Sequence, residues 1–398
     1  MKILVVSQYF YPENFRINQL CLDLKERGHD VTILTGKPNY PKGEYFDGYT
    51  FKGHEDEVWN GMRVLRTPLR ARKTGAVNLV RNYLSFVYHA NKRVKTIKED
   101  FDMIYVFEVS PITVALPAIK LKKKKNIPVI MNVQDLWPEN ITAVTGINNK
   151  IIIGMIDILV NYIYKHCDKI LTASPSFVDK IKDRVKDKEK VVYWPQYSVV
   201  SASEDDEQLF DSSKFNITFT GNIGVAQGID IAIETARILK DTRLHWNFIG
   251  EGRDKARLEE LCKKYELEKN VTFHGFKEEK YIPKYLNSSD AALLILKPNP
   301  VFEMTIPAKL QTYLACGAPI LGCVSGEGKK IILDSECGIV SDDISVDGLV
   351  SVCQRMLEFD DEQMKLFKSN SLKYGKKYFD KETLLDRLEK YMEELKNE

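Results

Sequence analysis

The stretch KILVVSQYFYPENFRINQLCLDLKERGHDVTILTG, residues 2–36, decides the fold class of this chain. It opens with a run of β-branched and apolar residues and closes with a similar run, DVTILTG, at 30–36; each run predicts a buried strand. Between them, apolar residues recur at the spacing of an amphipathic helix that ends at Gly28: Ile17, Leu20, Cys21 and Leu24. The stretch is therefore a strand–helix–strand unit, the building block of a parallel sheet.

The same alternation continues through the chain in two successive sets. A polar, acidic stretch without periodicity, residues 196–214, separates the sets. In the first set, further strands are expected at 102–108, 127–134, 169–174 and 190–195. In the second, strands are expected at 216–221, 245–250, 271–276, 291–296, 319–324 and 337–341. Two such sets indicate an α/β protein with two Rossmann-like, doubly wound parallel-sheet domains that face a cleft.

The expected domain limits follow from these sets. Residues 1–195 form an N-terminal Rossmann-like domain, 196–214 the linker, and 215–375 a C-terminal Rossmann-like domain. The last segment, 376–398, predicts an amphipathic C-terminal helix, and whether it packs back on the N-terminal domain is left open.

Composition describes a soluble globular chain with two unlike halves. Of 398 residues, 44% are hydrophobic and 29% are charged, which excludes a disordered or fibrous protein. The net charge of +2 conceals a basic first half, in which residues 1–200 carry 31 Lys and Arg against 21 Asp and Glu. A basic half predicts anionic partners, among which we do not expect nucleic acid.

The cysteines, the histidines and the hydropathy of the chain indicate where the protein is located and whether it binds a metal. The seven cysteines are scattered without a C-x-x-C pair and the six histidines are isolated, so we expect buried, reduced thiols in a cytosolic protein and no metal site. The N-terminus enters patterned sequence at once, without a cleavable signal. The most apolar stretch, 151–164, contains Asp157 and Asn161 and is too short to cross a bilayer.

Chemistry is expected in the loops that follow strands, because ligands of open parallel sheets bind beyond the carboxyl ends of the strands. The loop at 220–228 is rich in glycine, and Gly221 and Gly224 would let backbone amides approach a phosphate. A second glycine-containing loop follows the next strand and carries Gly250 and Arg253. Glycines in such turns are often only structural, so each loop alone is a weak signal.

Two other loops add contrasting chemistry. The loop at 9–16 contains no glycine, which argues against a nicotinamide-dinucleotide fingerprint after the first strand. It is either an ordinary connection or a substrate loop with three polar side chains at a helix start: Glu13, Asn14 and Arg16. In the loop at 273–281, Phe276 is an exposed aromatic residue that could meet a base.

The stretch EMTIPAKLQTYLACGAP, residues 303–319, combines a short apolar helix with an acidic neighbour. Pro307 suits the first helical position and Gly317 suits a left-handed stop. The amide end of this helix therefore points toward Glu303 and attracts anions, phosphate above all. A phosphate site beside a carboxylate fits a ligand that carries both a phosphate and hydroxyl groups.

Asp135 lies in NVQDLWPEN, residues 132–140, just past a buried strand. From position alone, its carboxylate is equally a helix cap or an acceptor of a sugar hydroxyl or a proton.

A basic segment rich in aromatic residues spans 63–95. Its cations include Arg66, Arg70, Arg72, Lys73, Arg81, Lys92 and Arg93, and its apolar residues include Leu79, Tyr83, Leu84, Phe86, Val87 and Tyr88. We expect the aromatic residues among them to pack in the core. For the arginine cluster, contact with anionic lipid or a lipid phosphate is favoured over a merely solvated face.

These motifs together resemble a known family. Glu303 with a polar residue eight positions later, followed by ACGAP, resembles the E-x7-E element of family-four retaining glycosyltransferases of the GT-B fold. The resemblance extends over nearly the whole chain to the bacterial capsule and O-antigen branch, which includes N-acetyl-fucosamine transferases. The stretches that carry it are YFYPENFRINQL, ERGHDVTILTGKPNYPKGEYFDGY, RNYLSF, QDLWPEN and GNIGVAQG.

The resemblance implies roles for matching positions. Glu303 would contact hydroxyls of the donor sugar, and Gln311 takes the place of the glutamate that holds the nucleotide's ribose. An amide can still accept a hydroxyl hydrogen bond, without charge assistance. Thr305 and Ile306 would offer backbone amides to the diphosphate, and Lys309 would add positive charge.

The glycine-rich loop departs from the family pattern. Many members carry an arginine and a lysine there, whereas Asn222 and Gln227 hold those places in this chain. Compensation of the leaving diphosphate then falls to Lys309, to Arg253 or Arg16, and to helix ends.

The implied activity is transfer of a sugar from a UDP-sugar to an undecaprenyl-diphosphate-linked saccharide in capsule or O-antigen synthesis. The sugar would be an N-acetylated deoxyamino sugar such as N-acetyl-L-fucosamine, moved by a hexosyltransferase that needs neither cofactor nor metal. Asp135 lies near the place where many relatives have a histidine beside the reacting carbon. The enzyme would be cytoplasmic, attached to the anionic inner face of the plasma membrane.

Two other classes remain as alternatives. A nucleotide-sugar epimerase of the same architecture would convert the donor without an acceptor. A non-catalytic nucleotide-sugar binding module would bind the donor without turnover, an option that the amide at Gln311 keeps open.

Overall fold

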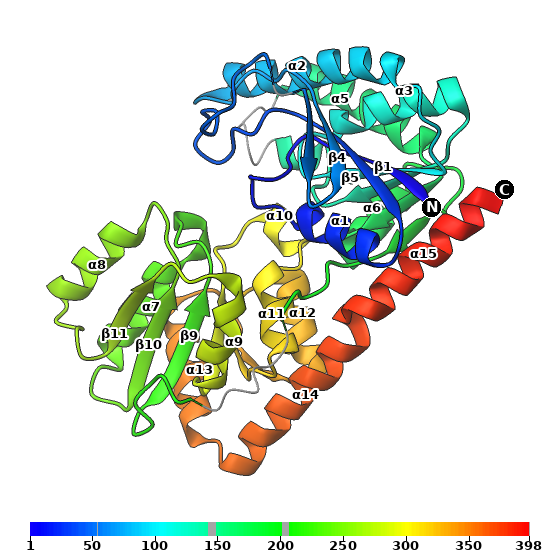
Figure 1. Ribbon diagram of the computed structural model, residues 1–398. Helices are drawn as coiled ribbons and strands as arrows, with labels where there is room; N and C mark the ends of the chain where they lie inside the picture. The colour runs from blue at the N-terminus through cyan, green and yellow to red at the C-terminus, as the bar shows by residue number, and fades with distance from the viewer. Residues whose placement is uncertain (54, 142–148, 201–206, 398) are drawn as a thin grey trace. The chain divides into compact units, whose positions relative to one another are not determined.

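A computed structural model describes residues 1–53, 55–141, 149–200 and 207–397, so part of the predicted linker, 201–206, lies outside the described residues. The chain divides into two compact units. Unit 1 comprises Met1–Trp194 and Leu385–Glu398, and unit 2 comprises Pro195–Leu384. Each unit is built around one sheet with helices packed on it (Figure 1).

Unit 1 contains an eight-stranded sheet of order β3-β4-β2-β1-β5-β6-β7-β8. The opening stretch forms the predicted strand–helix–strand unit, and it lies at the centre of the sheet, since Ile3 of β1 lies between Val31 of β2 and Met103 of β5 in parallel register. The strands are β1 (Lys2–Ser7), β2 (Asp30–Thr35), β3 (Asp56–Trp59), β4 (Met62–Arg66), β5 (Met103–Glu108), β6 (Val129–Val133), β7 (Lys169–Thr172) and β8 (Val191–Tyr193).

The hairpin of β3 and β4 was absent from the sequence-based expectation, and it makes the sheet mixed because these two strands are antiparallel. β3 is a half-exposed edge strand, so it lacks a continuous apolar run. A signal was nevertheless present: Asn60 and Gly61 both have positive φ, 47° and 73°, as a two-residue Asn-Gly hairpin turn requires.

The helices of unit 1 cover both faces of this sheet. They are α1 (Arg16–Glu26), α2 (Ala76–Thr96), α3 (Ala115–Lys125), α5 (Lys150–His166), α6 (Pro175–Lys182) and the short 3-10 helix η1 (Ile112–Val114). Figure 1 shows α2, α3 and α5 on one side and α1 on the other. The last helix, α15 (Lys381–Asn397), is tied to α1, because Arg27 at the end of α1 bonds Asp386 at 2.7 Å and Glu389 at 2.6 Å.

Unit 2 contains an all-parallel sheet of order β11-β10-β9-β12-β13-β14. The order reverses between β9 and β12, which creates the switch point where ligands of such sheets bind. The strands are β9 (Phe215–Thr220), β10 (Leu244–Ile249), β11 (Val271–Gly275), β12 (Ala291–Ile295), β13 (Ile320–Cys323) and β14 (Gly338–Val340). The helices are α7 (Ile229–Ile238), α8 (Lys255–Lys264), α9 (Ile282–Asn287), α10 (Pro300–Glu303), α11 (Ala308–Ala315), α12 (Gly326–Ser335), α13 (Val346–Glu358) and α14 (Asp361–Phe379), with 3-10 turns η2 (Val225–Gln227) and η3 (Glu279–Tyr281).

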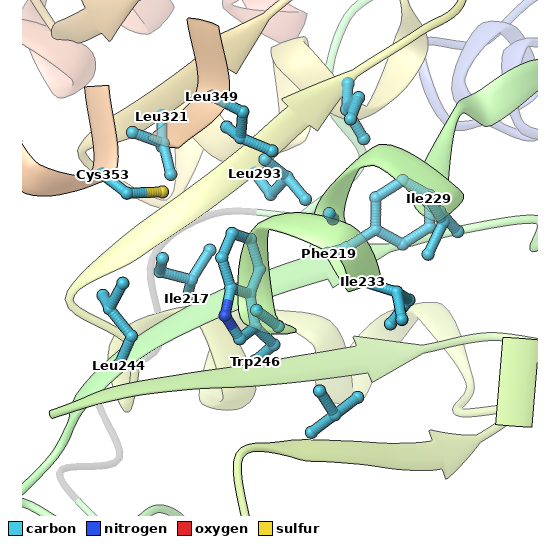
Figure 2. Packing of buried hydrophobic residues seen from close by; sticks show 14 of the residues in the cluster. Ile217, Phe219, Ile229, Ile233, Leu244, Trp246, Leu293, Leu321, Leu349 and Cys353 are labelled. Carbon is cyan, nitrogen blue, oxygen red and sulfur yellow. The ribbon is translucent and has the colours of Figure 1, made fainter. Parts of the chain in front are cut away.

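The core of unit 2 holds the strand ends in place. Figure 2 shows Phe219 and Trp246 packed with Ile233 of α7, and Leu349 of α13 beside Leu293. Burying an apolar side chain of this size stabilises the fold by about 1.5–3 kcal/mol. Because the strands cannot shift in such a core, the loops that leave their carboxyl ends have fixed starting points. All seven cysteines are buried and unpaired, as expected.

The helix predicted from Pro307 begins one residue later, at Ala308. Pro307 precedes it with φ −62° and ψ 128°, so the proline has extended backbone and its carbonyl accepts from Leu310 at 2.9 Å. The predicted stop is confirmed, since Gly317 has φ of +69°.

The expectation that the aromatic residues of this segment pack in the core holds for Phe86, which is buried, but is wrong for Tyr88, which is exposed on α2. Tyr83 is half-buried, and Leu84 of the same helix is exposed. The cations of this segment also differ from one another in burial and in pairing. Arg66 is buried and paired with Glu57, so it cannot face a lipid surface.

Candidate functional site

The loops at the switch point of unit 2 touch backbone to backbone, and glycine makes this possible. Gly250 has φ of +144°, and a Cβ there would lie 1.8 Å from the carbonyl oxygen of Gly221. A Cβ on Gly252 would lie 2.0 Å from the carbonyl oxygen of Ile223. Gly250 and Gly252 therefore let the β10 loop pack on the β9 loop, and any side chain would force the loops apart.

Lys309, in the first turn of α11, places its ammonium group against the glycine-rich loop. Its Nζ donates to Oε1 of Gln227 at 2.6 Å and lies 3.7 Å from the centroid of the Phe219 ring. It is also near Gly221, where a Cβ would lie 3.8 Å from Nζ. The predicted residues Gly221, Gln227 and Lys309 thus come together from two separate segments.

The electrostatics around Lys309 favour an anionic ligand. Burial lowers the pKa of this lysine to about 7, because an ammonium group loses hydration there. Among the described residues, Lys309 has no carboxylate partner. An anion brought to Nζ would favour the charged form of the lysine.

Backbone amides at the start of α11 provide further donors. The amides of Ile306, Ala308 and Lys309 donate to no residue that the structure describes, whereas Leu310 is bonded to Pro307. Thr305 differs from the expectation, because its amide donates to the carbonyl of Phe302 at 3.1 Å. Its hydroxyl also donates to the carbonyl of Val301, at 2.8 Å.

Glu303 ends α10 and lies next to the start of α12. Its Oε1 accepts from the hydroxyl of Ser325 at 3.0 Å, and the side chain is exposed. A Cβ on Gly326 would lie 2.0 Å from the carbonyl oxygen of Glu303, so only glycine permits this approach. The exposed second oxygen of Glu303 remains open to a ligand hydroxyl.

Gln311 is 3% exposed, yet its side chain makes no hydrogen bond with a described residue. Its amide atoms are not among the buried polar atoms that lack a partner, so the amide group is not sealed off in the core. A ligand hydroxyl at this position could donate to the amide oxygen.

Three residues that were predicted to bind the nucleotide-sugar donor lie at the outer edge of these loops. Phe276 is 71% exposed in the loop after β11, which is tied to the β10 loop because Gly250 donates to Gly275 at 2.9 Å. Arg253 is exposed and has no partner among the described residues. Asn222 is exposed as well, and its amide nitrogen would be 2.9 Å from a Cβ on Gly224.

In unit 1, Asp135 belongs to a hydrogen-bond network at the carboxyl ends of β5 and β6. Ser110 is its centre: its hydroxyl donates to Asp135 at 2.6 Å and accepts from Trp137 Nε1 at 3.1 Å. Asn140 donates to the same hydroxyl at 3.2 Å. Glu108, fully buried, accepts from the amide of Ser110 at 3.2 Å.

The charges in this network are perturbed by burial. Burial, and then the neighbouring Asp135 carboxylate, raise the pKa of Glu108 well above its usual range. Burial also raises the pKa of Asp135, against the hydrogen bond from Ser110. Burial raises the pKa of the nearby Tyr83 phenol to about 12, with the two carboxylates adding to the rise and Arg72 opposing it. Perturbed acids at strand ends are typical of functional sites.

Sequence reasoning found Asp135 but missed Ser110 and Glu108. The signal was the sequence EVSP, residues 108–111, at the end of the strand at 103–108, which places polar side chains at the same sheet edge as Asp135. It could have been found by aligning the ends of the two predicted strands.

The predicted residues of the first loop have unlike environments. Glu13 is buried, and its Oε1 accepts from the amides of Asn39 and Tyr40, both at 2.8 Å, while Oε2 accepts from Phe10 at 3.2 Å. Burial raises its pKa to about 7 despite these bonds. Its carboxylate therefore joins the loop to the segment after β2. Asn14 is exposed, and Arg16 begins α1.

Two searches of the described residues complete this survey. No helix within them is both long and apolar enough to cross a membrane. Within the same residues, no three His, Cys, Asp or Glu side chains are arranged so that they could hold a metal ion.

Two family models match the chain. The model described as "Glycosyl transferase 4-like domain" matches residues 14–196, and the one described as "Glycosyl transferases group 1" matches residues 201–373. Among known proteins, the putative colanic acid biosynthesis glycosyl transferase WcaI of Escherichia coli K12 is 25% identical over 343 residues, which cover 80% of this chain and 82% of that protein.

Solved structures show the same fold. Sucrose-phosphate synthase from Thermosynechococcus elongatus superposes with a TM-score of 0.75 at 15% identity, over 99% of this chain and 98% of that one. The Anabaena protein HepE in complex with UDP gives a TM-score of 0.70 at 14% identity, over 99% of this chain and 100% of that one.

Two α/β units of this kind, with these neighbours, define the GT-B fold, so the predicted fold class is confirmed. Both halves of the chain thus match glycosyltransferase models, and over most of its length the chain is similar to a bacterial glycosyltransferase. The comparisons give no support to the epimerase alternative.

Proposed function

We propose that this protein moves a sugar from a UDP-sugar to a lipid-linked saccharide during bacterial polysaccharide synthesis, with retention of anomeric configuration. One observation carries the proposal: Lys309, which has no carboxylate partner in the described part of the chain, lies against a glycine-rich loop at the switch point of unit 2. The UDP bound by the structural neighbour HepE and the colanic acid role in the name of WcaI support it. From motif resemblance, the sugar is an N-acetylated deoxyamino sugar such as N-acetyl-L-fucosamine.

In this proposal unit 2 binds the donor. The diphosphate accepts from Lys309 and from the free amides at the start of α11, where the helix dipole also favours negative charge. Glu303 accepts from the sugar hydroxyls, and Gln311 accepts from a ribose hydroxyl. Phe276 stacks on the base.

The chemistry consists of one bond exchange at the anomeric carbon. The bond from this carbon to the diphosphate oxygen breaks, the acceptor oxygen bonds to the same face, and the acceptor's proton passes to the departing diphosphate. Negative charge grows on the diphosphate, so Lys309 and the amides stabilise the transition state more than the ground state. Asp135, held by Ser110, accepts from an acceptor hydroxyl and fixes its orientation.

Charge stabilisation by lysine and amides leads us to propose that transfer is independent of divalent metal. The test is product formation after exhaustive chelation. Full activity in excess chelator is expected, and activity that disappears and returns only with added metal would contradict metal independence while leaving the transferase proposal intact.

We also propose that unit 1 attaches to an anionic membrane surface through α5 and α3. On α5, exposed apolar residues recur at helical spacing: Ile151, Met155, Ile158 and Tyr162. Cations flank this stripe, since α3 ends in four successive lysines, and Lys123 Nζ donates to the Tyr162 hydroxyl at 2.9 Å. α3 packs against α5, so both helices contribute to one surface. An apolar stripe with flanking lysines matches a membrane interface.

The membrane proposal is tested by flotation with phosphatidylglycerol vesicles. Ile158, which is 72% exposed, is replaced by aspartate, and Ile238→Asp on α7 of unit 2 is the matched control. Loss of flotation is expected for Ile158→Asp only. Equal flotation of both variants and the wild type would refute this surface.

The transferase proposal is tested in two steps. Thermal shift with a panel of nucleotide-sugars identifies the donor, because a ligand of the native state raises apparent stability by mass action. The donor is then incubated with and without a lipid-linked saccharide. A glycosylated product with retained configuration is expected; conversion of the donor without acceptor indicates an epimerase, and binding without any product indicates a binding module.

A further inference from the structure

A second pocket, in unit 1, is lined by cations that the donor site does not use. It has a volume of about 410 Å³ and lies where the first turns of α2 meet the segments around residues 45–51 and 70–73. Arg70, Lys73 and Arg81 line it, together with Tyr45, Phe51 and Asn78, and no carboxylate is among its lining residues.

Within the described ranges these three cations have no side-chain partner, in contrast to their neighbours. Arg66 is paired with Glu57, and both Arg63 and Arg93 are paired with Asp56. The side chains of Arg70, Lys73 and Arg81 are exposed and make no ion pair or hydrogen bond with a described residue. Three uncompensated positive charges around one pocket produce a field that attracts a multivalent anion.

The backbone that carries the cations is held firmly. The Tyr45 hydroxyl donates to the carbonyl of Leu69 at 2.8 Å, and the amide of Arg70 donates to the hydroxyl of Ser85 at 2.8 Å. The amide of Lys73 donates to the carbonyl of Gly43 at 3.0 Å. The two segments are also in close contact at Gly43, where an added Cβ would lie 2.8 Å from the amide nitrogen of Lys73. The pocket is therefore formed before a ligand arrives, which reduces the entropic cost of binding.

An exposed apolar stripe begins at the edge of this pocket. Val77, Val80, Leu84 and Tyr88 lie on one face of α2 and are all exposed. Arg81 lies within the same face, one turn before Leu84, which is 60% exposed. Lys92 continues the face and lies 4.5 Å from the centroid of the Tyr88 ring. A basic pocket at one end of an apolar stripe matches a molecule with an anionic head and an apolar chain.

We propose that this pocket binds the diphosphate head of the lipid-linked acceptor and that the stripe on α2 contacts its prenyl chain. Arg70 and Arg81 hold phosphate oxygens in their forked guanidinium groups, and Lys73 adds a third charge. The proposal rests on the proposed function for the lipid-linked nature of the acceptor. It assigns a separate anion site, on the other unit from Lys309.

Equilibrium binding without any donor tests this site. The probes are farnesyl diphosphate, inorganic pyrophosphate, and phosphatidylglycerol vesicles that lack a diphosphate. The triple variant R70Q/K73Q/R81Q removes the pocket's charges, and K180Q/K186Q/K188Q removes the same charge from exposed lysines elsewhere in unit 1. All these side chains are exposed, and circular dichroism checks that each variant is folded.

We expect the pocket variant to weaken farnesyl diphosphate binding by about 30-fold or more, because charge-assisted hydrogen bonds are lost, and the control variant to change it by less than about threefold. Leu84→Ser is expected to weaken farnesyl diphosphate without affecting pyrophosphate. Unchanged binding in the pocket variant refutes the site. Equal competition by vesicles without diphosphate also refutes it, in favour of a general anionic-surface contact.

Failure of this proposal is distinguishable from failure of the proposed function. If the pocket variant transfers sugar to a lipid-linked acceptor with unchanged kcat/KM, the site is refuted and the transferase stands. If the wild type binds farnesyl diphosphate through the pocket but forms no glycosylated product, the diphosphate site stands and the proposed reaction falls.

Discussion

Replacing Lys309 by methionine removes the ammonium group but keeps the length of the side chain, so it tests the charge alone. In the proposed complex, Nζ makes a charge-assisted hydrogen bond to a diphosphate oxygen in a site where burial has already lowered its pKa to about 7. Loss of such a bond from a desolvated anion costs about 2–4 kcal/mol, because the anion is left without its partner. The dissociation constant of a UDP-sugar should therefore rise by roughly 30-fold to 1000-fold.

The pH dependence gives a second, independent measure of the same interaction. The donor binds the protonated form of Lys309, and a diphosphate diester carries no proton between pH 6 and 9. Above pH 7 the free protein holds Lys309 increasingly neutral, so binding must take up a proton and affinity should fall by up to tenfold per pH unit, as estimated from linkage. Methionine at 309 abolishes this slope, and arginine abolishes it while retaining part of the affinity.

Calorimetry at pH 6–9 in two buffers of different ionisation enthalpy measures both affinity and proton uptake.

The free energy of unfolding supplies a control that needs no ligand. Because the folded pKa of Lys309 is lowered from 10.5, the unfolded state binds more protons between about pH 7 and 10.5, and this group adds stability as pH rises. A Lys309→Met protein that binds the donor within twofold of wild type, or keeps the same pH slope, would refute the role given to the ammonium group.

Three further predictions concern single side chains. Gln311→Leu should change the free energy of unfolding by less than about 1 kcal/mol, since the side chain makes no hydrogen bond with a described residue, while the dissociation constant of the UDP-sugar rises by about fivefold to tenfold. A chemical-unfolding curve with calorimetry checks both, and clearly lower stability with unchanged affinity would contradict it. Ser110→Ala should lower the free energy of unfolding, measured in urea, by about 2–4 kcal/mol, because Asp135, Trp137 and Asn140 all lose a partner. A decrease below about 1 kcal/mol would show that this hydroxyl does not hold the network together. The pKa of Glu13 is raised from 4.5 to about 7, so its contribution to the free energy of unfolding is present below pH 4.5 and is lost as the pH rises through 7, by up to about 3 kcal/mol. Between pH 5 and pH 8 the free energy of unfolding should therefore decrease less for Glu13→Gln than for the wild type. Equal decreases would disprove the pKa shift.

The parallel strands could be predicted from the sequence because they are buried on both faces, and a strand buried on both faces has a continuous apolar sequence. β1 at Lys2–Ser7 and β12 at Ala291–Ile295 are examples. The edge strand β3 at Asp56–Trp59 carries no such run, because one side of it faces solvent. Its Asn60-Gly61 turn was a local signal that apolar periodicity does not register.

Local sequence by itself determined which segments become strands, which helices follow them, and that glycine-rich loops and a lysine-bearing helix lie at strand ends. Only the tertiary structure decided which of these meet: Lys309 with Gln227 across 82 residues, and Ser110 with Asp135 across 25. It also decided that Leu84 and Tyr88 face outward and that Glu13 is bound by amides of the segment after β2. The physical reason is that periodicity reports burial along one element, whereas the partners and the pKa of a charged group depend on what the other elements bring to it.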